Sequence, residues 1–393
     1  MEVFHERKYA DKAIEKLFKS NSRWGSRDRR FVAEAVYEIV RHRRYFDYLA
    51  FGTQKSYFRK ETRRSIQRLI QVHLYFTEPD EWYEFDEPDK TFTPEMIEAR
   101  QEKNVSPEVQ YSFPDEIVGI FKKQFGDQYA TILQSLNQPA QVYLRVNTLR
   151  GKLEDLKTQL AVDNIEVDAV PDIPNCVQMR ERKNTFNTQA FKKGLFEVQD
   201  AASQKIAILV DPQPGERVCD ACAGGGGKSL HLASLMKNKG KIISMDIHEW
   251  KLAELKKRAA RGGVDIIETK LIDSTKAIKR LEKSFDRVLL DVPCSGSGVF
   301  RRNPDAKWKL TMEDLERLQQ TQKEILDDYS KMVKANGRLI YATCSLFEVE
   351  NQKQVSDFIK RHPEWTLIKE EIYRPDLQGF DGFYGAVLQR KPI

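Results

Sequence analysis

The chain has 393 residues, of which 40% are hydrophobic, and it carries a formal net charge of +6. This length exceeds that of one ordinary domain and predicts two or three. No apolar run approaches the ~18 residues that span a bilayer, which excludes membrane-spanning classes. The opening sequence MEVFHERKYA lacks the apolar segment of a secretory signal, and five cysteines without regular spacing favour free thiols over disulfides. We therefore expect a cytoplasmic protein.

Charge is unevenly distributed along the chain. Residues 1–70 contain 18 Lys/Arg and 9 Asp/Glu, whereas residues 78–90 contain seven acids and one lysine. A basic segment followed by an acidic, proline-containing one indicates a domain boundary, and it suits a polyanionic partner such as RNA. A solvated helical surface explains the basic excess about equally well, because Lys and Arg are good helix formers.

The basic segment is predicted to be helical. Apolar residues recur at helical spacing in residues 10–18 and again in residues 32–40, after an N-cap at Ser26. Residues 76–112 begin with the acidic stretch and then lack a clear period, so we predict a linker there. Arginines flank the second apolar face, which predicts a small helical bundle with a basic rim over residues 1–75. The rim residues are Arg27, Arg29, Arg30, Arg41, Arg43 and Arg44.

Residues 113–196 show a mixed pattern of helix and strand. Helical spacing in residues 113–126 and 129–136 is followed by residues 142–147, which alternate apolar and polar side chains as a half-buried strand does. We therefore predict a small α/β unit. A helix from Leu153 to Leu160 and short strands near Val167 and Val177 complete it.

Residues 197–393 alternate short apolar runs with helical stretches. This pattern predicts a mostly parallel sheet wrapped by helices, and in such a sheet ligands bind at the carboxyl ends of the strands. The predicted strands are residues 217–220, 241–246, 265–270, 287–291 and 338–342, with a closing strand at 382–389. The predicted helices are residues 229–238, 249–261, 274–281 and 311–333.

A glycine run follows the first of these strands, where residues 220–229 read DACAGGGGKS. A P-loop requires glycine at position 222, where this chain has cysteine, and a dinucleotide fingerprint requires glycine at 229, where it has serine. An acid followed by small residues at alternate positions fits an S-adenosylmethionine loop. Asp246, 20 positions after Gly226, is suited to bind ribose hydroxyls. A glycine-rich turn without a ligand is the remaining alternative.

Asp273 follows the third predicted strand. An adenine-contacting side chain is expected at this position. A surface aspartate that caps the helix from Ser274 explains the residue nearly as well, so both readings stay open here.

Two cysteines lie in short polar motifs at the ends of the fourth and fifth predicted strands, in residues 291–295 (DVPCS) and 343–345 (TCS). Adjacent parallel strands bring such residues to one cleft. A single buried cysteine is more often a small hydrophobe, but two in polar motifs favour thiol chemistry. Cys219 and Cys222 form a lone C-x-x-C without further ligands at metal spacing, so we expect no metal.

These motifs together resemble the Sun/nucleolar-protein (RsmB/NOP) family of RNA cytosine-5 methyltransferases. The marks of that family are a cofactor loop similar to Cys-Ala-Ala-Pro-Gly-Gly-Lys, a Pro-Cys-Ser motif and a Thr-Cys-Ser motif. Here the loop reads CAGGGGK, with Gly225 in place of proline. The resemblance runs from about Phe113 to the C-terminus. Further matches are residues 144–147 (LRVN), 198–203 (VQDAAS), 298–305 (GVFRRNPD) and 341–351 (YATCSLFEVEN).

The resemblance implies a fold and a substrate. The fold is a Rossmann-like class I methyltransferase domain with a mostly parallel seven-stranded sheet (197–393), preceded by a small α/β, RRM-like RNA-binding subdomain (113–196) and an all-α domain (1–75). The basic head looks like a short NusB-like RNA-binding domain, which family members that modify small-subunit ribosomal RNA carry. The implied partner is therefore RNA, most of all 16S rRNA. We expect a monomer that binds no membrane.

The resemblance also implies roles for individual residues. Cys344 would add to carbon 6 of cytosine and make carbon 5 nucleophilic, and Cys294 would assist release of the product. Asp291 would bond the base edge and supply a proton at N3, while Lys228 would orient the base or the carboxylate. The implied methyl donor is S-adenosylmethionine. The residues expected to bind it are Cys222, Ala223, Gly224, Gly225, Gly226, Gly227, Lys228, Asp246, Asp273 and Asp291.

Two alternatives stay open. Within the same chemistry, the substrate is transfer RNA rather than ribosomal RNA. Outside it, the chain is a catalytically idle RNA-binding assembly factor, although such a protein has no need for two thiols, the cofactor aspartates and Lys228 together.

Overall fold

The computed structural model describes residues 3, 9–54, 62–82 and 88–391. The chain divides into two compact units, which are Met1–Pro139 with Val299–Met312 and Ala140–Gly298 with Glu313–Ile393. We call them the first and the second unit. Among the described residues, every helix is too short or too polar to cross a membrane. Residues 113–139 lie in the same compact unit as the N-terminal helices. The division of the chain into the four predicted segments therefore stays a prediction.

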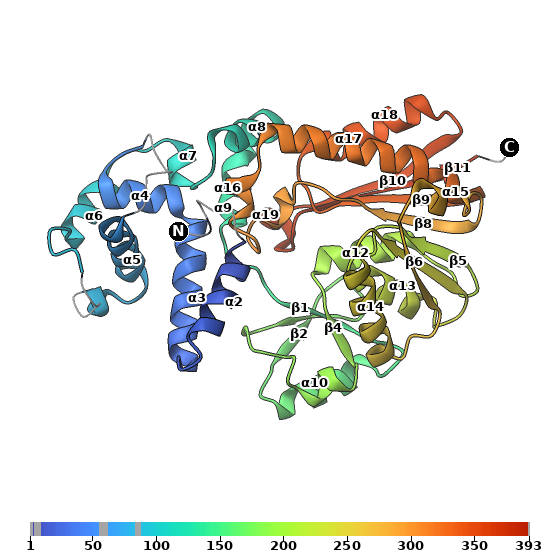
Figure 1. Cartoon of the computed structure of the whole chain (residues 1–393), viewed down its shortest axis with the longest axis horizontal. Helices are drawn as coiled ribbons and strands as arrows, with labels where there is room; N and C mark the ends of the chain where they lie inside the picture. Colours follow the sequence, from blue (N-terminus) through green and yellow to red (C-terminus); the bar gives the residue numbers. More distant parts are fainter. Residues whose placement is uncertain (1–2, 4–8, 55–61, 83–87, 392–393) are drawn as a thin grey trace. The chain divides into compact units, whose positions relative to one another are not determined.

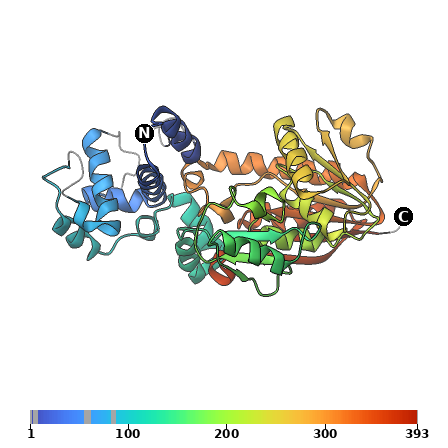
Figure 2. The ribbon, with the colours of Figure 1, turned by 90° about the horizontal axis from the view of Figure 1, so that it is seen from below.

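The described part of the first unit is built from helices, which are blue to teal in Figures 1 and 2 except for α16 (Ala306–Lys309), which is orange. Within the segment predicted as a linker, residues 88–112 form two helices, and Phe92, Ile97 and Val109 are buried in the same core cluster as Leu49. Short helices carry too few turns to show a hydrophobic period. The helices are α2 (Ala10–Ser20), α3 (Ser26–Arg41), α4 (Arg43–Phe51), α5 (Arg63–Thr77), α6 (Pro94–Gln101), α7 (Pro107–Gln110), α8 (Asp115–Phe125), α9 (Tyr129–Leu136) and α16 (Ala306–Lys309).

Half of the predicted basic rim is buried. Arg41, Arg43 and Arg44 are at most 7% exposed. Arg43 pairs with Asp47 at 2.9 Å, and Arg44 donates to the carbonyl oxygen of Phe113 at 3.0 Å. Buried arginines are retained where such partners satisfy them. Arg43 is bonded within α4, whereas Arg44 connects α4 to the segment before α8. The predicted N-cap is also off by one residue, since Gly25 caps α3.

The second unit begins with a four-stranded antiparallel sheet of order β2-β3-β1-β4. Leu144, Val177 and Phe196 form its core with Leu156 of the helix α10. β1 was expected to be half-buried, but Arg145 on its polar side is only 2% exposed. Arg145 lies beside Ser234, so the second face is covered as well. The elements are β1 (Tyr143–Val146), α10 (Leu153–Val162), β2 (Val167–Ala169), β3 (Cys176–Met179), α11 (Gln189–Lys192) and β4 (Phe196–Val198).

A seven-stranded, mostly parallel sheet follows, as predicted. Strands β9-β8-β5-β6-β7 run parallel, and β11 lies antiparallel between β9 and β10. The strands are β5 (Arg217–Asp220), β6 (Lys241–Asp246), β7 (Ile267–Leu271), β8 (Phe285–Asp291), β9 (Val333–Thr343), β10 (Trp365–Tyr373) and β11 (Phe383–Arg390). The helices are α12 (Ala201–Val210), α13 (Gly227–Leu235), α14 (Glu249–Gly262), α15 (Thr275–Lys279), α17 (Met312–Tyr329), α18 (Gln352–Arg361) and α19 (Pro375–Gln378).

Helices cover both faces of this sheet. Ile278 of α15, Leu326 of α17 and Phe358 of α18 share one core cluster with the strands, and Figure 1 shows α17 and α18 along the strands β8 to β11. Gly385 of β11 faces the other way and meets Ile206 of α12. α13 packs between α12 and α14 in that second layer. The sheet is therefore a Rossmann-like three-layer core.

The predicted strands are all present, with small shifts at their ends. The helix predicted to reach Val333 ends at Tyr329, and β9 begins at Val333. β10 was not predicted, because it pairs with β11 alone and most of its side chains are exposed. An edge strand of this kind lacks the apolar run that marks a buried one.

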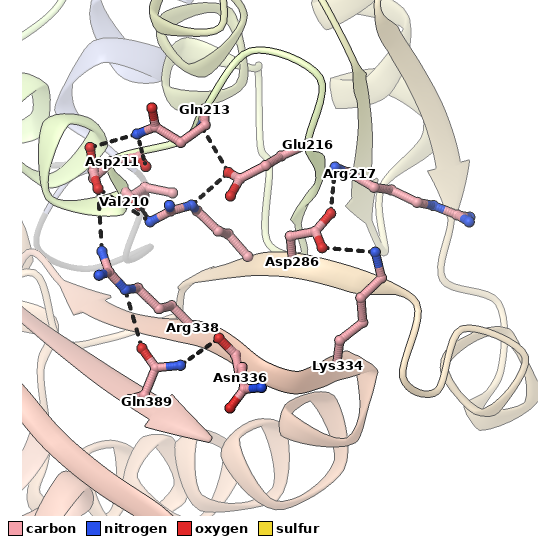
Figure 3. Close-up of polar contacts among 11 residues, drawn as sticks. Val210, Asp211, Gln213, Glu216, Arg217, Asp286, Lys334, Asn336, Arg338 and Gln389 are labelled. Atoms are coloured by element: carbon pink, nitrogen blue, oxygen red, sulfur yellow. Dashed lines mark hydrogen bonds and ion pairs between the residues drawn. The ribbon is translucent and has the colours of Figure 1, made fainter. Parts of the chain in front are cut away.

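The amino ends of the parallel strands are closed by a polar network (Figure 3). Arg287 of β8 donates to Glu216 at 2.6 Å, and Lys334 of β9 donates to Asp286 at 2.8 Å. These groups satisfy one another at the edge opposite the two cysteine motifs. The network comprises Asp211, Gln213, Glu216, Arg217, Asp286, Arg287, Lys334, Arg338 and Gln389.

Candidate active site

The two cysteine motifs lie at the carboxyl ends of neighbouring parallel strands. β8 and β9 pair through Asp291 and Ala342, so the loop after β8 lies beside the residue after β9. The Sγ atoms of Cys294 and Cys344 are 3.3 Å apart. The fold thus brings together two thiols that are 50 residues apart in the sequence.

The thiol of Cys294 keeps its proton at neutral pH. Its pKa is raised well above its ordinary value, first by the hydrogen bond with Cys344 and then by burial. Either sulfur can be the donor of the hydrogen bond between the two thiols.

A buried carboxylate fixes the spacing of the two motifs. Glu350 accepts hydrogen bonds from the backbone N–H of Ser295 at 2.8 Å and from the hydroxyls of Ser295 and Ser345 at 2.5 Å each. Gln322 of α17 donates to the same carboxylate at 2.9 Å. Each of these serines follows one of the cysteines, so one side chain positions both.

Replacing Glu350 with alanine leaves these donors without an acceptor in a buried place. We expect a loss of roughly 3 kcal/mol in the free energy of unfolding, measured by denaturant titration, because an unsatisfied buried donor costs about 1–3 kcal/mol. Turnover should fall by about 100-fold, as it does when reacting groups are misplaced by ~1 Å. Glu348→Ala, on the same turn but exposed, is the matched control and should change neither. Equal losses in both variants would contradict this role.

An ion pair lies next to the thiols. Lys228 Nζ is 2.6 Å from Asp291 Oδ2 and 5.2 Å from the ring centroid of Phe383. Burial alone lowers the pKa of Lys228, but attraction to Asp291 and the hydrogen bond with it outweigh burial, so the pKa is raised. Lys228 therefore stays charged at neutral pH. Its charge also interacts with Cys344.

The glycine loop connects β5 to α13. The Ala223 N–H donates to the carbonyl oxygen of Met245 at 2.8 Å, and the Gly224 N–H donates to Asp246 Oδ2 at 2.9 Å. Gly226 has φ +83°, and a Cβ there would lie 2.4 Å from Leu255 Cγ. Position 226 therefore requires glycine on both conformational and steric grounds. The loop presents backbone rather than side chains to the carboxyl end of the sheet.

The predicted aspartates lie on different strands. Asp246 is 7% exposed at the end of β6, and its other oxygen accepts from the backbone N–H of His248 at 2.9 Å. Asp273 follows β7, is exposed, and accepts from the hydroxyl of Ser274 at 3.0 Å. The N-cap of α15 is Ser274 itself, so Asp273 does not occupy the capping position. Cys222 is partly buried beside the loop, and Cys219 is buried in the core of the sheet.

Comparison with known proteins identifies the family. A family model described as 16S rRNA methyltransferase RsmB/F matches residues 207–387, and one for an RsmF/B-like ferredoxin-like domain matches residues 113–185. The chain is 35% identical to the probable ribosomal RNA small subunit methyltransferase B of Bacillus subtilis, over 71% of this chain and 67% of that protein. The chain belongs to the RsmB/F family.

Other similar proteins support the same family assignment for this RsmB/F methyltransferase. The ribosomal RNA small subunit methyltransferase B of Pectobacterium carotovorum is 32% identical over 75% of this chain and 71% of that protein. The crystal structure of PH0851 matches 96% of this chain and 93% of its own with a TM-score of 0.76 and 27% identity. The family resemblance seen in the motifs is therefore confirmed, and with it the methyltransferase fold. The chain is an RNA methyltransferase.

Asp220 is a residue of this RsmB/F methyltransferase that the predicted site omitted. It ends β5, and its Oδ2 accepts from Ser229 at 2.7 Å. Its Oδ1 is buried and has no hydrogen-bond partner among the described residues. A buried acceptor beside a glycine loop suits a donor from a bound molecule, and the position as first acid of the loop was the signal in the sequence.

Burial raises the pKa of Asp220 to about 6 from an ordinary value of 3.8. The pKa of Asp220 is higher in the folded than in the unfolded state. The contribution of its protonated side chain to the stability of the fold is therefore complete below pH ~4 and is lost as the pH rises through 6. The difference corresponds to about 3 kcal/mol. In cofactor-free protein, Asp220→Asn should therefore gain stability relative to the parent between pH 4 and 7, as measured by thermal unfolding in matched buffers. A constant difference across this range would contradict the raised pKa.

Proposed function

We propose that this RsmB/F methyltransferase methylates carbon 5 of a cytosine in 16S ribosomal RNA. The observation that carries the proposal is the pair of neighbouring thiols, with the Sγ atoms of Cys294 and Cys344 3.3 Å apart. Carbon 5 of cytosine is too weak a nucleophile to accept a methyl group directly, and a thiolate that adds at carbon 6 makes it enamine-like. A methyltransferase acting on an amine or a hydroxyl has no need of a thiol.

In this mechanism Cys344 attacks and Cys294 assists release. The positive charge of Lys228 interacts with Cys344, which supports the assignment of Cys344 as the attacking group. After methyl transfer, the proton on carbon 5 must leave before the Cys344–carbon 6 bond can break. Cys294 is the group next to that bond, so we assign it to this release step.

Asp291 and Lys228 would hold the base. As the carboxylic acid, the Asp291 side chain would bond the Watson–Crick edge of cytosine and donate its proton to N3, which helps carbon 6 accept the thiolate. Lys228 fixes the direction of that carboxylate through their 2.6 Å contact. The base must leave its stack to reach these groups, so single-stranded or flipped RNA is the substrate form.

S-adenosylmethionine fits the glycine loop as the methyl donor. When bound, it supplies an electrophilic sulfonium methyl group. Asp246 would hold the ribose hydroxyls and Asp273 the adenine, while the unpaired Oδ1 of Asp220 would accept from the amino acid end. The loop from Cys222 and Ala223 through Gly227 would supply backbone contacts.

Residues 1–75 and 113–196 would bind the RNA and residues 197–393 would carry catalysis, in a cytoplasmic monomer. The exposed Arg27 and Arg30 of α3 support an RNA-binding role for the first unit. Relatives named ribosomal RNA small subunit methyltransferase B favour ribosomal RNA over transfer RNA.

Bisulfite sequencing of total RNA tests the proposal. A strain lacking the gene should lose one protected cytosine in 16S rRNA, and the wild-type gene should restore it while Cys344→Ala should not. Loss of a protected cytosine in transfer RNA instead would assign the substrate to that class. An unchanged pattern in both RNAs would contradict cytosine-5 methylation.

A further inference from the structure

The cofactor loop contains four consecutive glycines, Gly224 to Gly227. Glycine has the largest conformational freedom of all residues, so such a run is ordered before ligand binding only if bonds from neighbouring groups hold it. Gly224 is held by Asp246, and the N–H of Gly226 donates to the carbonyl oxygen of Ala223 at 2.9 Å. The remaining anchor comes from a residue outside the loop.

That residue is Arg258 of α14, whose Nη1 donates to the carbonyl oxygen of Gly225 at 2.6 Å. This carbonyl and the N–H of Gly226 belong to the same planar peptide unit. Arg258 therefore holds one side of the unit while Ala223 holds the other. With both polar groups bonded, the peptide cannot turn without losing a hydrogen bond.

Arg258 is itself held in a fixed direction. Its Nε and Nη2 donate to Glu197 Oε2 of β4 at 3.2 and 2.8 Å, and Glu197 is 6% exposed. Arg261, one turn further along α14, pairs with the other oxygen of Glu197. A planar guanidinium can bond a carboxylate and a carbonyl at once, which the ammonium of lysine cannot reproduce in this geometry.

We propose that Arg258 is a positioning residue that orders the loop for binding of S-adenosylmethionine. The proposal rests on the proposed function and names a residue that acts through the loop rather than on the methyl group. Gly225 stands where the family loop has proline, and its φ is outside the left-handed region that favours glycine, so the backbone conformation does not require glycine there. A Cβ at 225 would, however, lie 3.3 Å from Arg258 Nη1, tighter than ordinary contact.

Arg258 and a proline at 225 are therefore alternative ways to restrict the same loop, and they interfere when both are present. The test uses Arg258→Ala, Gly225→Pro and the double variant, with calorimetric Kd for S-adenosylmethionine and the kinetic constants for both substrates. Arg258→Ala should weaken cofactor binding about 10-fold, the scale of one hydrogen bond to a charged group. KM for the cofactor should rise in parallel, while kcat at saturation should stay within about two-fold.

Gly225→Pro should then have opposite effects on cofactor binding in the parent protein and in the Arg258→Ala variant. Beside Arg258 it should weaken cofactor binding, because the ring crowds the guanidinium. In the Arg258→Ala background it should recover a factor of about two to five, the usual gain from restricting a loop. Arg258→Lys should fall between Arg258→Ala and the parent.

Arg261→Ala is the matched control, because Arg261 pairs with the same Glu197 from the same helix but does not contact the loop. It should lower the melting temperature as Arg258→Ala does and leave the cofactor Kd within about two-fold. A Kd unchanged by Arg258→Ala, an equal weakening by Arg261→Ala, or no recovery by Gly225→Pro would each overturn the proposal. If the parent protein itself fails to bind S-adenosylmethionine, the proposed function fails instead.

Discussion

We expect Cys344→Ala to abolish methyl transfer while binding of S-adenosylmethionine survives. The variant removes the sulfur that we propose adds to carbon 6 of cytosine, and in that mechanism carbon 5 does not react without the addition. Loss of a nucleophile that works together with its neighbours lowers turnover by about 10⁴-fold or more. Transfer of labelled methyl groups from S-adenosylmethionine to 16S rRNA measures the loss, and calorimetry measures the retained cofactor binding.

Cys176→Ala is the control for the removal of a thiol as such. Cys176 is buried in β3 of the small sheet, away from the two motifs, and should leave turnover near that of the parent. Near-normal turnover in Cys344→Ala would show that the attack comes from a different group. Lost cofactor binding would mean that the substitution disturbed the fold of the site rather than its chemistry.

In the Cys294→Ala variant we expect a covalent protein–RNA adduct to accumulate. Cys344 can still attack and the methyl group can still transfer, but the step that releases carbon 6 lacks its assisting thiol. The adduct should survive denaturing electrophoresis and appear as a slowly migrating band that contains both RNA and protein. Multiple turnover should nearly cease, while a first round of methylation remains detectable.

The double variant separates this result from incidental crosslinking. Cys294→Ala combined with Cys344→Ala should give no adduct, because the attacking sulfur is gone. An adduct formed by the Cys344→Ala variant would mean that Cys294 attacks and Cys344 assists release. Absence of an adduct from Cys294→Ala under turnover conditions would remove Cys294 from the release step.

Much of the fold was predictable because its signals are local. The strands β5, β6, β8 and β9 are short apolar runs that end in polar residues, and a parallel sheet buries such runs on both faces. Elements without that signature were missed. β10 is an exposed edge strand, and the helices in residues 88–112 are too short for a period to show.

The burial of these charged side chains could not be predicted from the sequence. Arg41 and Arg44 read as part of a basic rim, and nothing in their spacing reveals that they bond carbonyl oxygens of the distant residues Arg301 and Phe113. Glu350 stood in a recognised motif, but its bonds to Ser295 and Gln322 depend on how three segments meet. Whether a charge is a surface group or an internal anchor is decided by what packs around it.

The sequence by itself determined which functional groups the site contains: two cysteines in polar motifs, a glycine loop, and acids at the ends of strands. These are properties of residue type and short spacing, which the chain carries before it folds. Only the tertiary structure decided that the thiols meet at 3.3 Å, that Glu350 holds both motifs and that Arg258 reaches the loop. Each of these depends on distances between segments far apart in the chain, and such distances exist only when the sheet has formed.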